Sequence, residues 1–206
     1  MNIEQINEIG SLNEVNPQLD IPAFLRLDET GEFAPSIEVQ AAEICEVFRD
    51  IPELQFENWQ GLSVEQRTEA LNTFETEIAK IEMRNAMPVE HENLGLGIYG
   101  YCDRTKVVVS DAQIGSNNYA DYREVLDTLL HEGRHAYQFY NLEVRRTEQS
   151  ETLVDAWKVN LNELGYDSAS TYDTLFATRG YHRYYTQPIE VDARHFAETV
   201  MNKLGL

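Results

Sequence analysis

TLLHEGRHAYQFY, residues 128–140, is the stretch that decides the fold of this chain. It places two histidines, His131 and His135, four positions apart, with Glu132 directly after the first. At about 100° per residue, the surrounding sequence predicts a helix over residues 119–140 with both histidines and Gln138 on one face. The opposite face is a continuous apolar stripe of Tyr122, Val125, Leu126, Leu129, Gly133, Ala136, Tyr137 and Tyr140.

The amino-acid composition limits the classes of protein to which this chain can belong. With 206 residues, 42% of them hydrophobic and 10% aromatic, we expect a packed globular fold rather than disorder. The 16 Lys and Arg against 36 Asp and Glu give a formal net charge of −20, which disfavours nucleic-acid binding because such a surface repels phosphates. No apolar run is long enough to span a membrane. The first twenty residues do not resemble a secretory signal, which predicts a cytoplasmic protein or export by a signal-less secretion route.

The rest of the chain predicts a mostly helical α+β fold. Residues 1–35 carry Pro17, Pro22, Gly31 and Pro35 among mixed residues and are expected to form an N-terminal arm, followed by one domain over residues 36–206. Besides the long helix, the domain should contain a small sheet of three or four strands packed on that helix. Apolar periodicity, a Ser63–Gln66 capping box and β-prone runs predict helices from residues 36, 63, 150 and 188, and strands near residues 98–101 and 106–110. Cys45 and Cys102 imply no disulfide framework and are expected to be small buried residues.

The motif His-Glu-x-x-His has a physical logic on a helix. Residues four apart lie one above the other, so both imidazoles can reach one ion. Zinc accepts such nitrogen ligands and, in a catalytic site, keeps one position open. Glu132, beside the ligands, can take a proton from water as general base, and Gly133 is expected to leave room near the metal. The alternative is a solvated helix face, because short motifs also arise by chance.

A catalytic metal site needs a third ligand, and the best candidate is Glu190. On the helix expected over residues 188–204, Glu190 lies at the border of the buried face, where a carboxylate needs a partner. The alternatives are Glu151, which with Asp155 projects from a solvated edge, and Asp192 or His195, which point away from the buried face. Glu190 also has a purely structural interpretation, as a first-turn carboxylate stabilised by the helix dipole.

Two stretches carry a resemblance to a known family. LLHEGRHAYQ, residues 129–138, followed by YYTQPIEVDARHFA, residues 184–197, resembles the zincin metallopeptidases whose third ligand is glutamate. The likeness is greatest to small bacterial members with a His-Glu-x-x-His-x-x-Gln helix and a later Glu-x-x-Ala helix, some of whose relatives are toxin or effector domains. The resemblance covers about residues 95–204.

The resemblance implies a zincin-like domain with one Zn²⁺ per chain, held by His131, His135 and Glu190. It also implies Glu132 as the general base in peptide-bond hydrolysis. An edge strand above the site should align an extended peptide or protein substrate, and residues 106–110 are the candidate. Gln138 is a candidate to support a ligand, although a plain polar position is an equal alternative.

Peptide hydrolysis also needs a donor to the oxyanion that forms at the carbonyl. RGYHRYYTQ, residues 179–187, offers Tyr185, Tyr184 and His182 shortly before Glu190. The alternative is that these rings pack in the core and leave their hydroxyls at its rim.

The predicted function is a zinc-dependent peptidase. A hydrolase of non-peptide amides, a structural zinc site and a protein-interaction module are the alternatives. Glu132 argues against the last two, since a structural site needs no base beside its metal. We expect no nucleic-acid or membrane partner, and the sequence leaves the oligomeric state open.

Overall fold

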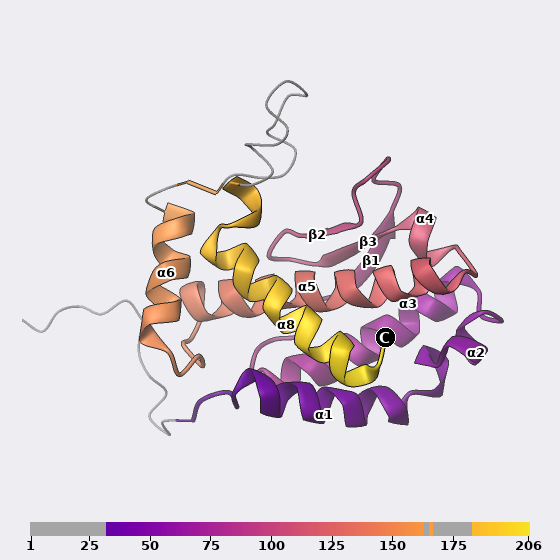
Figure 1. Cartoon of the computed structure of the whole chain (residues 1–206), viewed down its shortest axis with the longest axis horizontal. Coiled ribbons are helices and arrows are strands. Elements are labelled where there is room, and N and C mark those ends of the chain that lie inside the picture. The colour runs from indigo at the N-terminus through magenta and orange to yellow at the C-terminus, as the bar shows by residue number, and fades with distance from the viewer. Residues whose placement is uncertain (1–31, 163–164, 167–182) are drawn as a thin grey trace, which may run out of the picture.

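The computed structural model describes residues 32–162, 165–166 and 183–206. Within these residues the chain is mostly helical and carries a small mixed sheet, which confirms the predicted α+β class (Figure 1). Most of the N-terminal arm predicted over residues 1–35 lies outside the described part. The described helices are α1 (Ile37–Asp50), η2 (Pro52–Leu54), α2 (Phe56–Trp59), α3 (Val64–Ile81), α4 (Asp111–Ile114), α5 (Tyr119–Glu143), α6 (Glu151–Asn162) and α8 (Pro188–Leu204).

The start of α3 shows how local sequence determines a helix boundary. Its N-cap, Ser63, accepts a hydrogen bond from the Gln66 amide at 3.3 Å, while the Gln66 side chain accepts one from the Ser63 amide at 2.9 Å. This reciprocal pair satisfies backbone donors that the first turn leaves without helical partners. The predicted capping box is therefore confirmed.

Within the described residues, the sheet has three strands in the order β1 (Val89–Glu92), β3 (Val107–Ser110), β2 (Gly100–Cys102). Strands β1 and β3 are parallel, and β2 and β3 are antiparallel. The expectation that residues 106–110 form the edge strand is wrong, because β3 is paired on both sides. All four β3 residues are buried, as befits a central strand covered on both faces. The edge strand that contacts α5 is β2.

Gly100 allows the edge strand to approach α5 closely. A Cβ at this position would lie 2.4 Å from Thr128 Cγ2 and 2.5 Å from the Val108 carbonyl oxygen, both far inside contact distance. It would also lie 3.6 Å from Glu132 Cγ. The missing side chain therefore lets β2 lie directly against the helix that carries the His-Glu-x-x-His motif (Figure 1).

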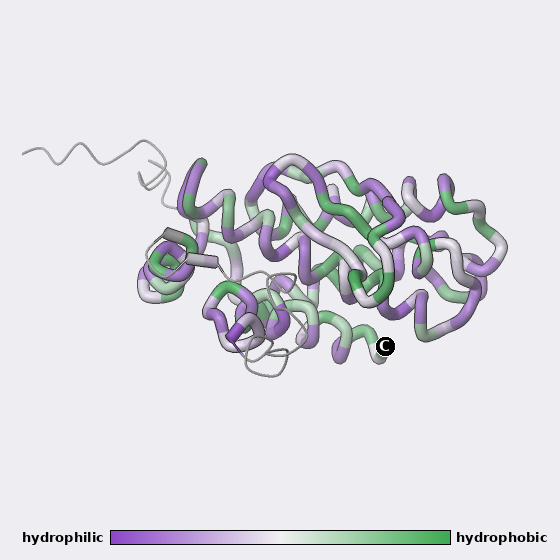
Figure 2. The backbone as a smooth tube through the Cα atoms, turned by 90° about the horizontal axis from the view of Figure 1, so that it is seen from above, coloured by the Kyte–Doolittle hydropathy of each residue, from purple (hydrophilic) through white to green (hydrophobic). Residues whose placement is uncertain are grey.

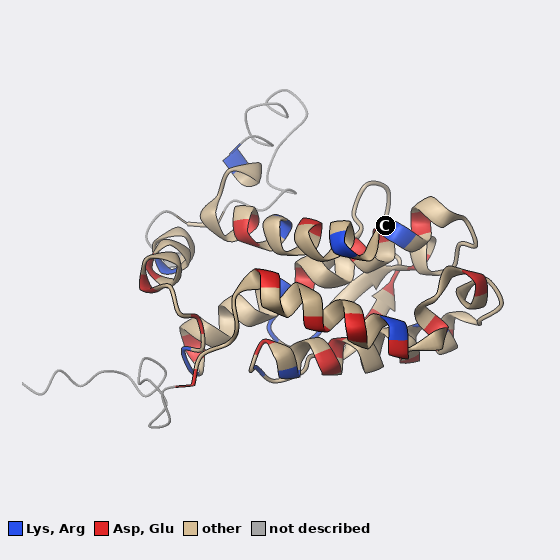
Figure 3. Ribbon diagram, turned by 60° about the horizontal axis from the view of Figure 1, so that its bottom comes forward, with Lys and Arg blue, Asp and Glu red and all other residues tan. Residues whose placement is uncertain are grey.

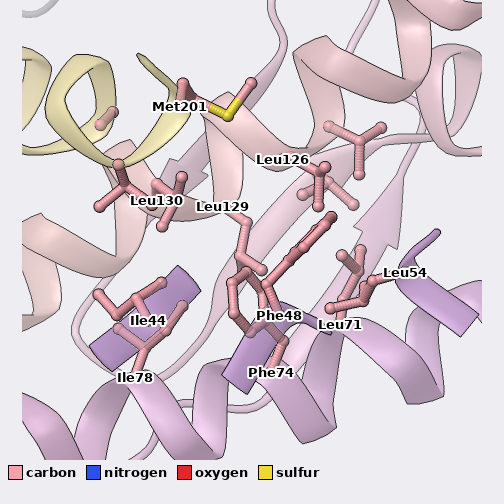
Figure 4. Close-up of a cluster of buried hydrophobic side chains, with 14 of the residues drawn as sticks. Ile44, Phe48, Leu54, Leu71, Phe74, Ile78, Leu126, Leu129, Leu130 and Met201 are labelled. Carbon is pink, nitrogen blue, oxygen red and sulfur yellow. The ribbon is translucent and has the colours of Figure 1, made fainter. Parts of the chain in front are cut away.

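The hydrophobic core lies between α1, α3, α5 and α8 and extends to the sheet. Figure 4 shows its side chains meeting from these helices, with Phe48 and Phe74 in edge-to-face contact at 5.7 Å between ring centroids. A smaller cluster joins α6 to α5 and α8 around Trp157. Hydrophobic and hydrophilic residues alternate along the helices, as amphipathic packing requires (Figure 2). Burying the apolar stripe of α5 on this core fixes the direction of its opposite, polar face.

The expectation that both cysteines are buried holds for Cys45, while Cys102 is only partly buried. Acidic residues are distributed over most of the helices, with fewer basic residues between them (Figure 3). Both cysteines are free, and burial raises the pKa of the Cys102 thiol to about 12, so that it stays protonated and unreactive. Among the described helices, none is both long and apolar enough to cross a membrane.

Candidate metal centre

Two neighbouring helices bring three potential metal ligands together. His131 and His135 extend from α5, and Glu190 extends from the first turn of α8, which packs against it. His131 Nε2 lies 3.3 Å from Glu190 Oε2, and His135 Nε2 lies 3.4 Å from Glu190 Oε1. One ligand atom from each residue lies within 4.8 Å of the others. Such a group can hold a metal ion, and we call these three residues the triad.

Glu190 is completely buried and carries its charge. Burial on its own would raise the pKa of this carboxyl, but the imidazoles of His131 and His135, 3.3 and 3.4 Å from its two oxygens, hold the pKa well below its usual range. Its Oε2 atom accepts no hydrogen bond from any described group. Arg194 Nη1 lies 3.8 Å from Oε2. A buried carboxylate oxygen with an unfilled acceptor site, facing two imidazoles, is the environment in which a cation is most strongly favoured.

The other candidates for a third ligand lie elsewhere. The Glu151 side chain is 78% exposed and 3.7 Å from Arg146, and His195 is exposed on α8. Asp192, expected to point away from the buried face, is buried instead and receives two hydrogen bonds from Arg134. That expectation was wrong because the periodicity of α8 does not reveal an arginine on another helix.

The His135 ring also has a partner at the nitrogen that faces away from Glu190. Its Nδ1 atom lies 2.7 Å from Gln138 Oε1. Burial opposes a charge on this imidazole, but the nearby Glu190 carboxylate and the charge of Glu132 raise its pKa to about 9. The carboxylates around the ring therefore outweigh its desolvation and favour positive charge at this position.

Glu132 lies close to both the triad and the edge strand. Its Cγ would lie 3.6 Å from a Cβ on Gly100 of β2, and its charge contributes to raising the pKa of His135. It is not one of the three residues whose ligand atoms converge. Glu132 therefore lies beside the triad without belonging to it.

Gly133 lies on the buried side of α5, as its place in the apolar stripe predicts, and not beside the triad. A Cβ there would lie 3.3 Å from Glu75 Oε2 and 3.4 Å from Arg84 Nη2. Glycine thus lets α5 pack against the buried Glu75–Arg84 ion pair, and the expectation that it leaves room near the metal was wrong. Gly133 is two residues from His131 and two from His135, and at about 100° per residue it therefore faces the opposite, core side of the helix.

A tyrosine that the sequence analysis missed contacts the triad. The Tyr166 hydroxyl donates a hydrogen bond of 2.8 Å to Glu190 Oε1. Tyr184 lies beside it, with 6.4 Å between the ring centroids. Burial, followed by the charge of Glu190, raises the pKa of both hydroxyls, so both stay protonated and able to donate. Tyr166 is far from either motif in sequence, and no local pattern marks it.

The remaining predicted donors have different surroundings. Tyr185 is 42% exposed, and the Arg194 guanidinium lies 3.6 Å from its ring centroid. Arg194 also donates a hydrogen bond to the Tyr185 carbonyl. His182 lies outside the described residues. Tyr184 is therefore the predicted donor that the described structure brings into interaction with the triad.

Comparison of this chain with protein-family models, with curated proteins and with solved structures finds no match. We therefore infer the chemistry of this protein from the triad and the groups around it.

Proposed function

We propose that this protein is a zinc-dependent metallopeptidase with a zincin-like domain. The observation that carries the proposal is the convergence of His131, His135 and the buried Glu190, with Glu132 immediately beside them. Two imidazole nitrogens and one carboxylate form a donor set that suits catalytic zinc, which takes three protein ligands and leaves a position open. The residues fit the ion, since Glu190 Oε2 is buried and accepts no hydrogen bond from a described group.

The roles of the residues follow from their positions. His131, His135 and Glu190 would hold the zinc, which when bound supplies a Lewis acid that polarises the scissile carbonyl and lowers the pKa of a water molecule. Glu132 takes a proton from the attacking water and delivers it to the leaving amine. The protonated hydroxyls of Tyr166 and Tyr184, both close to Glu190, are candidates to donate to the developing oxyanion.

Strand β2 supports a peptide as the substrate. Its inner edge pairs with β3, and no described strand pairs with its outer edge. An open edge offers backbone donors and acceptors to an extended chain, which binds by adding a strand. Because Gly100 brings this strand against Glu132, a peptide aligned on β2 would pass beside the proposed base.

Digestion of a peptide library, read by mass spectrometry, tests the proposal. Zinc-loaded protein should cleave peptides, a chelator should abolish cleavage, and added zinc should restore it. Cleavage that resists chelation would contradict a zinc peptidase. Zinc-dependent hydrolysis of small non-peptide amides, with no peptide cleaved, would instead establish the amide hydrolase on the same site.

A further inference from the structure

Gln138 links the triad to a buried carboxylate. Its side-chain amide is completely buried one turn beyond His135 on α5. The amide nitrogen donates to the Ile189 carbonyl oxygen at 2.9 Å and to Asp192 Oδ2 at 2.8 Å. The amide oxygen faces His135 Nδ1 at 2.7 Å. Both polar atoms of this side chain therefore have hydrogen-bond partners, the nitrogen on α8 and the oxygen on His135.

Those partners allow one orientation of the amide. The Ile189 carbonyl and the Asp192 carboxylate only accept hydrogen bonds, so the end of Gln138 that faces them must be the NH₂ group. Reversing the amide would place its oxygen against two further acceptors. In the observed orientation the oxygen faces His135 Nδ1, and this ring nitrogen must carry a hydrogen to make the contact. The unprotonated nitrogen of a neutral His135 is then Nε2, the atom that faces Glu190.

Asp192 is itself fixed by an arginine. Arg134 is completely buried and donates to Asp192 through Nε at 2.9 Å and Nη2 at 3.2 Å. Its third nitrogen donates to Glu82 Oε1 at 3.2 Å, and Glu82 also accepts from Arg84 at 2.7 Å. A two-point contact between planar groups holds the carboxylate in one orientation. Asp192 can therefore impose that orientation on Gln138.

We propose that Asp192 is a positioning residue for the metal centre: acting through the Gln138 amide, it keeps the hydrogen of His135 on Nδ1 and leaves Nε2 free to bind the ion. The proposal rests on the proposed function only in taking His135 as a ligand. It explains why α5 carries the buried amide of Gln138 and α8 the buried carboxylate of Asp192 beside the triad, although neither residue belongs to the triad. Groups that hold metal-binding imidazoles in this way typically contribute 10- to 100-fold to metal affinity.

The first test measures zinc affinity by competition with a chromogenic chelator. Gln138→Met keeps the size of the side chain but removes its hydrogen bonds, and should weaken zinc binding by about 10- to 100-fold. Asp192→Asn keeps the shape but loses the carboxylate, and should weaken binding in the same direction. If both residues act through the same chain of contacts, from Asp192 through Gln138 to His135, which we call the relay, their effects should not add. The double variant should then bind zinc no more weakly than whichever single variant has the lower zinc affinity. Additive losses would overturn the relay.

The matched control is Asn141→Leu. Asn141 is a second completely buried amide on α5, and it binds the Tyr137 carbonyl and the amides of Thr147 and Glu148 instead of a triad residue. Its replacement should lower stability yet leave the zinc affinity of the folded protein unchanged. Loss of affinity in this control equal to that of Gln138→Met would mean that any buried defect in α5 disturbs the site, and would contradict a specific role for Gln138.

The second readout does not need the metal. In metal-free protein labelled with ¹⁵N-histidine, the Nδ1 proton of His135 should exchange slowly with water in wild type and in Asn141→Leu. Exchange should be faster in Asp192→Asn and fastest in Gln138→Met. Equal exchange in all four proteins would overturn the proposal. If the exchange rates follow this order but wild type binds no zinc at the triad, the relay stands and the proposed function fails.

Discussion

Replacing Glu132 by glutamine is expected to lower peptide turnover by about 10²-fold or more, the scale of a positioned general base. Glutamine keeps the shape of the side chain and removes its ability to accept a proton. Zinc should remain bound, because Glu132 does not belong to the triad. The measurement is the rate of cleavage of a library peptide by wild type and Glu132→Gln at equal zinc occupancy.

Glu143→Gln is the matched control for this experiment. Glu143 lies on the same helix, is about half exposed, and pairs with Arg104 at 2.8 Å rather than with the triad. This variant should cleave at the wild-type rate, because an exposed ion pair contributes little to stability and nothing to proton transfer at the site. Equal cleavage by wild type and Glu132→Gln would mean that the activity has another source or another base.

Replacing Glu190 by alanine is expected to weaken zinc retention by about 10-fold or more, since the protein loses one of three ligands. The buried carboxylate contributes both an oxygen donor and the negative charge that favours a cation beside two imidazoles. The measurement is the zinc dissociation constant, obtained by competition with a chelator.

Glu151→Ala is the control for the third ligand, and it should leave the zinc dissociation constant unchanged. This glutamate also begins a helix in the sequence, but its side chain is largely exposed and 3.7 Å from Arg146. A result in which Glu151→Ala loses zinc and Glu190→Ala retains it would show that the wrong helix was assigned to the triad.

Hydrophobic periodicity was enough to predict the two helices that carry the triad. The apolar stripe of α5 determines which side of that helix packs on the core, so His131 and His135 had to share the other side. Pro188 begins α8 as predicted, and Glu190 follows in its first turn. These features depend on residues close in sequence, where the helical repeat relates position to direction.

Contacts between distant elements could not be predicted in the same way. The pairing of Arg134 with Asp192 and the contact of Tyr166 with Glu190 depend on how α5, α8 and the chain before α8 pack. The sheet order depended on β1, which the sequence analysis missed: it alternates poorly and has only one fully buried residue. Without β1, the buried β3 was mistaken for an edge strand.

The most direct test of the metal centre is an anomalous difference map, calculated from X-ray data collected above and below the zinc absorption edge on crystals of protein purified without added metal. We predict one zinc peak per chain, bonded to the Nε2 atoms of His131 and His135 at about 2.0–2.1 Å and to a carboxylate oxygen of Glu190. A map with no peak between these residues in zinc-soaked crystals, or with zinc held by other residues alone, would contradict the proposed metal centre.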